Sequence, residues 1–168
     1  IALSWCTQLV PVRTPANNSL PKGRSMERFL CDEMLARLCR YLRAAGYDAA
    51  LASDGVRDRV LLQQCRAEAR RFLTLDRRIV EHKAAAGVAV VLPTPRLEDQ
   101  ARILASVFGL DWLSRAFTRC LVDNTPLLPA TAGQRVRFPW LPLDDAEPVS
   151  ACPACGRVYW RGSHYRRM

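Results

Sequence analysis

The sequence lacks several features that would place it in a simple class. Its 168 residues include 8 glycines and 11 prolines, too few for a collagen-like or low-complexity chain. No apolar run approaches the ~18 residues that a transmembrane helix needs. It contains neither the Gly-x-Ser-x-Gly elbow of a nucleophilic serine nor a glycine-rich phosphate loop. The sequence therefore offers no motif of a serine hydrolase or of a P-loop enzyme.

The composition that remains is that of a folded and strongly basic chain. Hydrophobic residues make up 49% of it, which argues against general disorder. The length fits one ordinary domain, or a small domain with a metal-held appendage. The formal net charge is +9, from 25 Lys and Arg against 16 Asp and Glu. This excess favours a polyanionic partner such as nucleic acid, although many basic proteins bind nothing specific.

The seven cysteines differ in their surroundings. Cys31, Cys39 and Cys65 sit inside apolar periodic segments, where cysteine behaves as a small buried hydrophobic residue. A secreted disulfide scaffold would be shorter and denser in cysteine, and the count here is odd. We therefore expect a cytoplasmic protein in a reducing environment. We also expect no membrane partner, since no long apolar run is present, and no small-molecule cofactor.

Residues 1–25 differ from the rest of the chain. They begin with Ile1, contain no acidic residue, and are interrupted by proline, asparagine and glycine. No basic residue precedes their short apolar start, which argues against a signal peptide. A well-patterned segment opens at Met26. We expect residues 1–25 to be a disordered or extraneous leader and the fold to begin near Met26.

Apolar runs and helical periodicity alternate from residue 28 onwards. Runs at 28–31, 48–52, 71–75 and 88–92 predict short buried strands. Apolar residues at helical spacing predict helices at 34–45, 58–69, 79–86 and 97–108. Strands that alternate with helices are typical of an α/β fold with a parallel sheet covered on both faces. In such folds ligands bind at the carboxyl ends of the strands.

Carboxylates stand at those predicted strand ends. Asp32 follows the first strand and Asp76 follows the third, so their side chains converge if the two strands are neighbours. Carboxylates packed together repel unless a cation intervenes, and a hard divalent ion suits oxygen ligands. Asp58 opens a predicted helix, where helix capping is an equally good explanation. Other candidate carboxylates are Glu33, Asp54 and Glu68, the last of which could instead pair with a neighbouring arginine.

The C-terminal region carries a second pattern of ligands. Cys152-x-x-Cys155, followed by Gly156, is typical of a zinc knuckle, because the tight turn lets two thiolates bind one ion. Cys120 is an obvious third ligand. The fourth is open between Asp123, which stands where a second knuckle would have cysteine, and His164. A degenerate, metal-free turn is the alternative. The basic, aromatic residues 157–168 suit RNA, although Tyr159 and Trp160 could instead pack the ribbon core.

These motifs together resemble a known family. The segments are 29–35 (FLCDEML), 42–48 (LRAAGYD), 58–62 (DRVLL), 67–70 (AEAR) and 72–77 (FLTLDR), with 117–120 (FTRC) and 152–160 (CPACGRVYW) further on. Over about residues 28–168 the chain resembles the Mut-seven C-terminal RNase domain family, a PIN-like family with an attached zinc ribbon. Residues 1–25 fall outside the resemblance.

The resemblance implies a PIN-like Rossmannoid parallel sheet flanked by helices over residues 26–113 and a small zinc ribbon over residues 117–168. It also implies metal-dependent cleavage of RNA. Carried over by position, Asp32, Asp58 and Asp76 would be the catalytic residues that hold Mg²⁺ or Mn²⁺, with Asp54 and Glu68 in reserve. Structural Zn²⁺ would be held by Cys120, Asp123, Cys152 and Cys155.

Two functions remain open at this point. The first is a divalent-metal-dependent ribonuclease, a hydrolase that uses the aspartate cluster on RNA phosphodiester bonds. The second is a non-catalytic RNA-binding protein that uses the same groove and ribbon. A PIN-like toxin is a third possibility, against which the ribbon argues. The sequence leaves open the RNA substrate, the choice between endo- and exonucleolytic cleavage, and the oligomeric state.

Overall fold

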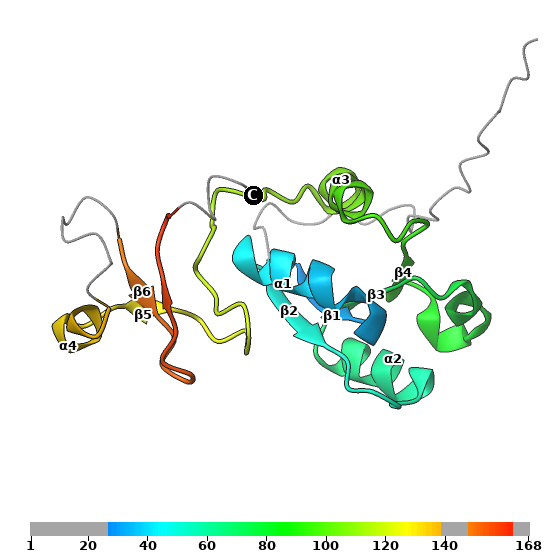
Figure 1. Cartoon of the computed structure of the whole chain (residues 1–168). Coiled ribbons are helices and arrows are strands. Elements are labelled where there is room, and N and C mark those ends of the chain that lie inside the picture. Colours follow the sequence, from blue (N-terminus) through cyan, green and yellow to red (C-terminus); the bar gives the residue numbers. More distant parts are fainter. Residues whose placement is uncertain (1–26, 139–147, 163–168) are drawn as a thin grey trace, which may run out of the picture.

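A computed structural model describes residues 27–138 and 148–162 of the chain (Figure 1). The leader, residues 1–25, lies outside the described residues, and so does His164. Residues 28–108 form ten elements in the order β1 (Arg28–Cys31), η1 (Glu33–Leu35), α1 (Ala36–Ala44), β2 (Asp48–Leu51), α2 (Asp58–Ala67), β3 (Arg71–Thr74), η2 (Arg77–Glu81), η3 (Lys83–Ala85), β4 (Ala89–Val91) and α3 (Leu97–Phe108).

Strands β1 to β4 form one parallel sheet in the order β2-β1-β3-β4. The predicted α/β fold with a parallel sheet flanked by helices is confirmed. In the register of the two central strands, Leu30 pairs with Phe72 and Cys31 with Leu73. Because β1 and β3 are neighbours, the residues that follow them emerge side by side at the carboxyl edge of the sheet.

Helices cover both faces of this sheet. Helices α1 and α3 pack on one face, where Phe29, Leu42 and Leu104 are fully buried and the ring of Phe29 meets Phe108 edge to face at 5.6 Å. Helix α2, η2 and η3 cover the other face, where Leu62 of α2 shares a core with Leu30 and Phe72 of the sheet. The three cysteines interpreted as small hydrophobic residues, Cys31, Cys39 and Cys65, are buried in these two cores.

The segment predicted as a helix at 79–86 folds differently. It forms two short 3₁₀ turns, η2 and η3, separated by His82, whose backbone is extended. The carboxylate of Asp76 accepts a hydrogen bond from the backbone N–H of Arg78, which favours a tight turn directly after the strand. Apolar periodicity alone does not distinguish such turns from a short helix.

The C-terminal region forms a small three-stranded antiparallel sheet in the order β5-β6-β7. Its strands are β5 (Leu128–Pro129), β6 (Ser150–Ala151) and β7 (Val158–Tyr159), with the short helix α4 (Ala132–Val136) between the first two. Thr131 and Gln134 form a capping box at the start of α4. None of the helices in the described parts of the chain combines the length and apolar character required to cross a membrane.

This C-terminal unit lies beside the end of α1 and the start of β2 (Figure 1). The backbone N–H of Phe117 donates to the carbonyl of Ala44, and the side chain of Asn124 donates to Asp48. The start of β2 belongs to the amino edge of the parallel sheet. The ribbon therefore sits at the end of the domain opposite to the carboxyl edge.

Candidate active site and metal centre

Asp32 and Asp76 meet at the carboxyl edge of the two central strands. The hydroxyl of Thr74, the last residue of β3, donates to Oδ2 of Asp32 at 2.6 Å. The same hydroxyl oxygen accepts from the backbone N–H of Asp76 at 3.0 Å. Thr74 is 1% exposed, so its hydroxyl cannot exchange these partners for water. One buried side chain thus ties together the two aspartates that the sequence placed at strand ends.

An open pocket lies over this pair. Its lining consists of Asp32, Glu33, Met34, Leu75, Asp76 and Arg78. Asp32 is half-buried, whereas Asp76 is exposed, so both carboxylates can be reached from solvent. The pocket thereby combines three acids with one arginine at a single strand edge, an arrangement that suits a cation together with an anionic ligand.

Glu33 extends the acidic group towards the loop that follows β2. The neighbouring carboxylate of Asp54 raises the pKa of Glu33, and burial and Asp32 add to the effect. A carboxyl whose pKa is raised by like charges gains from a cation placed between them. Asp54 was named from the sequence as a reserve ligand. It lies next to Glu33, which lines the pocket, and is therefore close to the pocket itself.

Asp58 stands apart from this group. It is the first residue of α2, and its carboxylate lies 3.7 Å from Nε2 of His82. It does not line the pocket. Arg57, not Asp58, occupies the helix N-cap, and Asp58 is the acidic residue of the first turn. His82 is thus a partner of a candidate ligand.

Glu68 lies at the opposite edge of the sheet. Its carboxylate is bound by Arg70 and by the side-chain amide of Gln64, and its carbonyl accepts from Arg28 at the start of β1. These contacts lower the pKa of Glu68, with the hydrogen bond from Arg70 as the main cause. The structure does not bring Glu68 to the other acids. Its contacts are instead those of the alternative given from the sequence, an ion pair with a neighbouring arginine.

A metal-ligand cluster is present in the ribbon. One ligand atom each from Cys120, Asp123, Cys152 and Cys155 lies within 4.8 Å of all the others. The sulfurs of Cys120 and Cys155 are 3.6 Å apart, and Oδ2 of Asp123 is 3.3 Å from the sulfur of Cys152. Three thiols and one carboxylate form a donor set that suits tetrahedral zinc. Within residues 27–138 and 148–162, the acids around the pocket form no group as tight as this one.

Local turns hold the ribbon ligands in place. In the knuckle, the N–H of Cys155 donates to the sulfur of Cys152, and Gly156 adopts a φ of +73°, which favours glycine. The hydroxyl of Tyr159 lies 3.1 Å from the sulfur of Cys120, and its ring stacks on Phe117 with centroids 6.3 Å apart. Tyr159 therefore packs the ribbon core, as one of its two interpretations proposed.

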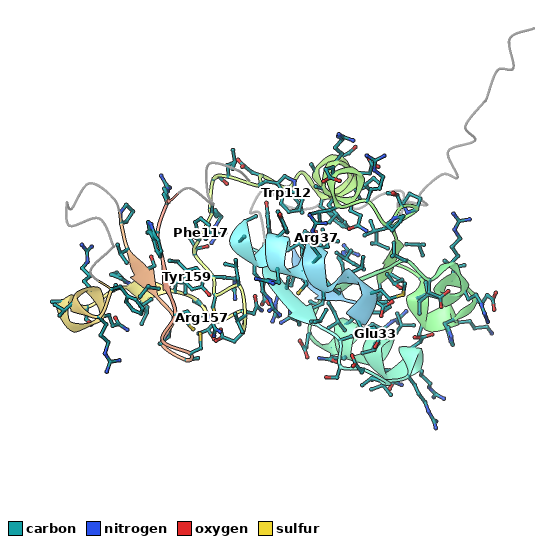
Figure 2. The ribbon with its side chains drawn as sticks, in the orientation of Figure 1. Glu33, Arg37, Trp112, Phe117, Arg157 and Tyr159 are labelled. Atoms are coloured by element: carbon teal, nitrogen blue, oxygen red, sulfur yellow. The ribbon has the colours of Figure 1, made fainter. Side chains whose placement is uncertain are left out.

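The two sites lie at opposite ends of the domain. Figure 2 shows Glu33 near the start of α1 and Phe117 with Tyr159 beyond its other end. Helix α1 has nine residues, which corresponds to about 13 Å of separation along its axis. The ribbon thus lies outside the acidic pocket and does not contribute to its lining.

Sequence reasoning missed the part that Thr74 plays. A threonine two residues before a strand-end aspartate is a usable signal, because its hydroxyl reaches the next N–H groups and the neighbouring strand. It also missed the contacts of Arg43, which lies on α1 together with Arg37 and Arg40. Arg43 is 8% exposed and bonds to the ribbon, whereas the other two are exposed.

Comparison with known proteins identifies the family. No curated protein and no solved structure matches the sequence. The family model for the Mut7-C RNAse domain matches residues 27–168, which cover all the described residues. The matched range includes the two strand-end aspartates and the Cys152-x-x-Cys155 turn. The chain therefore belongs to the Mut7-C RNAse domain family.

Proposed function

We propose that this protein is a divalent-metal-dependent ribonuclease that works at the acidic pocket above β1 and β3. Family membership indicates a nuclease or another RNA-related function. The observation that carries the proposal further is the pairing of Asp32 and Asp76 through the buried hydroxyl of Thr74. A purely structural role of this pair would not account for Glu33, a third acid that lines the same pocket.

In this proposal Asp32 and Asp76 form the centre of the ion-binding set. Glu33 and Asp54 supply negative charge on one flank, and Asp58 lies on the α2 side. A bound Mg²⁺ or Mn²⁺ would supply activation of water and neutralisation of the developing charge on the leaving oxygen. The chain's own contribution is to fix the carboxylates and to place a cationic side chain, Arg78, in the same pocket.

A separate part of the proposal concerns zinc. We assign Cys120, Asp123, Cys152 and Cys155 to one structural Zn²⁺, because the set offers four ligands and leaves no open position for substrate. In a reducing cytoplasm the thiols stay available as ligands. The zinc organises the ribbon and takes no part in cleavage.

A second candidate function is RNA binding without cleavage. It is favoured by the wide spacing of the carboxylates around the pocket. Within the described residues, no three of them bring their oxygens within 4.8 Å of one another. In such a protein the pocket would bind a cation or a phosphate without the close approach that hydrolysis requires. Arg78 in the pocket fits either function.

The test is cleavage of single- and double-stranded RNA with Mg²⁺, with Mn²⁺ and with EDTA. The ribonuclease proposal expects metal-dependent products that Asp32→Asn abolishes while RNA binding persists. Asp99→Asn is the matched control, because Asp99 lies on α3 and its ion pairs within the described residues are with Arg96 and Arg102, close to it in sequence. Binding of RNA without cleavage under every metal condition would instead support the second function.

A further inference from the structure

The segment that supplies two ribbon ligands also docks the ribbon on the parallel sheet. Cys120 and Asp123 bracket Leu121 and Val122, and the backbone carbonyls of these two residues face α1. Nη1 of Arg43 donates to both carbonyls, at 3.2 Å to Leu121 and 2.6 Å to Val122. A single buried guanidinium therefore binds the backbone between two metal ligands.

The next residue, Asn124, makes the second docking contact. Its Nδ2 donates to Oδ1 of Asp48 at 2.7 Å, and its Oδ1 accepts from the backbone N–H of Ala49 at 3.2 Å. Asn124 has a φ of +67°, a left-handed conformation that asparagine tolerates better than most residues. Asp48 is held in turn by Arg70 at 2.7 Å. Asn124 is thus fixed between a metal ligand and a buried ion pair.

These contacts cover the free edge of the sheet. Strand β2 is the edge strand, so its outward N–H and C=O groups have no strand partner. At Ala49 the N–H is taken by Asn124 and the carbonyl by Nε of Arg43, at 2.7 Å. The side chain of Asp48 is 13% exposed, and Arg43 as a residue is 8% exposed. Loss of docking would therefore leave polar groups at this edge without the partners that they have in the docked state.

We propose that metal binding in the ribbon and docking of the ribbon on β2 are thermodynamically coupled. The proposal rests on the structural zinc site proposed above. A metal that joins Cys120 and Asp123 to the knuckle fixes the 120–124 turn in the shape that Arg43 and Asn124 recognise. Coupling of this kind is reciprocal: the metal protects the edge of β2, and the docking contacts tighten the metal.

The experiment uses the full chain with zinc and follows both directions of the coupling. Hydrogen exchange is measured by mass spectrometry with and without a chelator, and zinc affinity is measured by competition with a chromophoric chelator. The variant is Asn124→Gly, which removes both side-chain bonds and keeps the positive φ without strain. The control is Gln134→Ala, which likewise removes two side-chain hydrogen bonds in the ribbon, both of them accepted from Thr131 within the same capping box.

Chelation is expected to raise exchange in the peptide that carries Ala49 at least tenfold, while the peptide of β3 stays protected. Asn124→Gly is expected to weaken zinc binding by roughly 5- to 150-fold, the usual range of coupling between sites, and Gln134→Ala to leave it within twofold. Unchanged protection of Ala49 after metal removal, or equal zinc affinities for the two variants, would overturn the coupling. A wild-type chain that retains no zinc would overturn the metal site itself. None of these three results bears on RNA cleavage.

Discussion

Replacement of Thr74 by valine tests the geometry of the acidic pocket. Valine keeps the shape of threonine and removes the hydroxyl that donates to Asp32 and accepts from Asp76. A hydrogen bond to a charged acceptor contributes about 1.5–3 kcal/mol. Asp76 is an exposed residue, so the bond from its N–H adds less. We expect Thr74→Val to lower the free energy of unfolding by about 2–3 kcal/mol.

The same substitution should loosen the ion-binding set. Loss of a residue that orients a metal ligand typically weakens metal affinity by about 10–100-fold. Thr74→Ser is the matched variant, because it keeps the hydroxyl and loses one methyl group, at a cost of about 1 kcal/mol. It should retain most of the affinity for Mn²⁺.

The assays are urea unfolding, followed by tryptophan fluorescence, and calorimetric titration with Mn²⁺. Trp112 packs against the core of the parallel sheet and reports on its unfolding. Equal stability of the serine and valine variants would show that the hydroxyl does not bridge the aspartates. Equal Mn²⁺ affinities would show that the bridge does not support an ion site.

Three further predictions concern the fold and the ribbon. Burial opposes ionisation of Asp48, but hydrogen bonds led by the one from Arg70 outweigh it and lower the pKa of Asp48 to about 2, against 3.8 for a free carboxyl. This difference in pKa contributes about 2 kcal/mol to the stability of the folded state above pH 4. The gap in unfolding free energy between wild type and Asp48→Asn should therefore narrow by about that amount as the pH falls from 4 to 2, and a constant gap in acid titrations would refute this. Gly46 has a φ of +89°, and a Cβ there would overlap the backbone that leads into the ribbon. Gly46→Ala should therefore lower the free energy of unfolding in urea by about 2 kcal/mol or more. An unchanged free energy of unfolding would contradict this close approach. Metal analysis should find about one zinc per chain, and Asp123→Ala should reduce its retention more than His164→Ala, with the reverse order moving the fourth ligand to His164.

The strands were predictable because a parallel sheet buried on both faces requires continuous apolar runs. All four lie within one residue of their predicted bounds at each end. The positions of Asp32 and Asp76 followed from the same logic, since each comes just after a central strand. Their partnership through Thr74 was missed. The threonine two residues before Asp76 is a signal for it, but threonine is common in strands, and the bond to Asp32 depends on which strand lies next to β3.

The helix arginines show a different limit of sequence reasoning. Arg37, Arg40 and Arg43 recur at similar spacing on α1, and composition treats them alike. Of the three, Arg43 bonds to the ribbon, through backbone carbonyls that lie 78 and 79 residues further along the chain. Its role therefore depends on a contact that helical periodicity does not encode. Asp48 likewise resembles an ordinary strand-start residue until Asn124 and Arg70 are placed beside it.

The most direct test of the central claim is to locate a divalent ion in the acidic pocket. A crystal of the full chain grown with Mn²⁺ and measured for anomalous scattering would show it. The proposed ribonuclease site predicts an anomalous peak about 2 Å from carboxylate oxygens of both Asp32 and Asp76, lost in Asp32→Asn. An empty pocket at saturating Mn²⁺, with both carboxylates ordered and unliganded, would contradict the account.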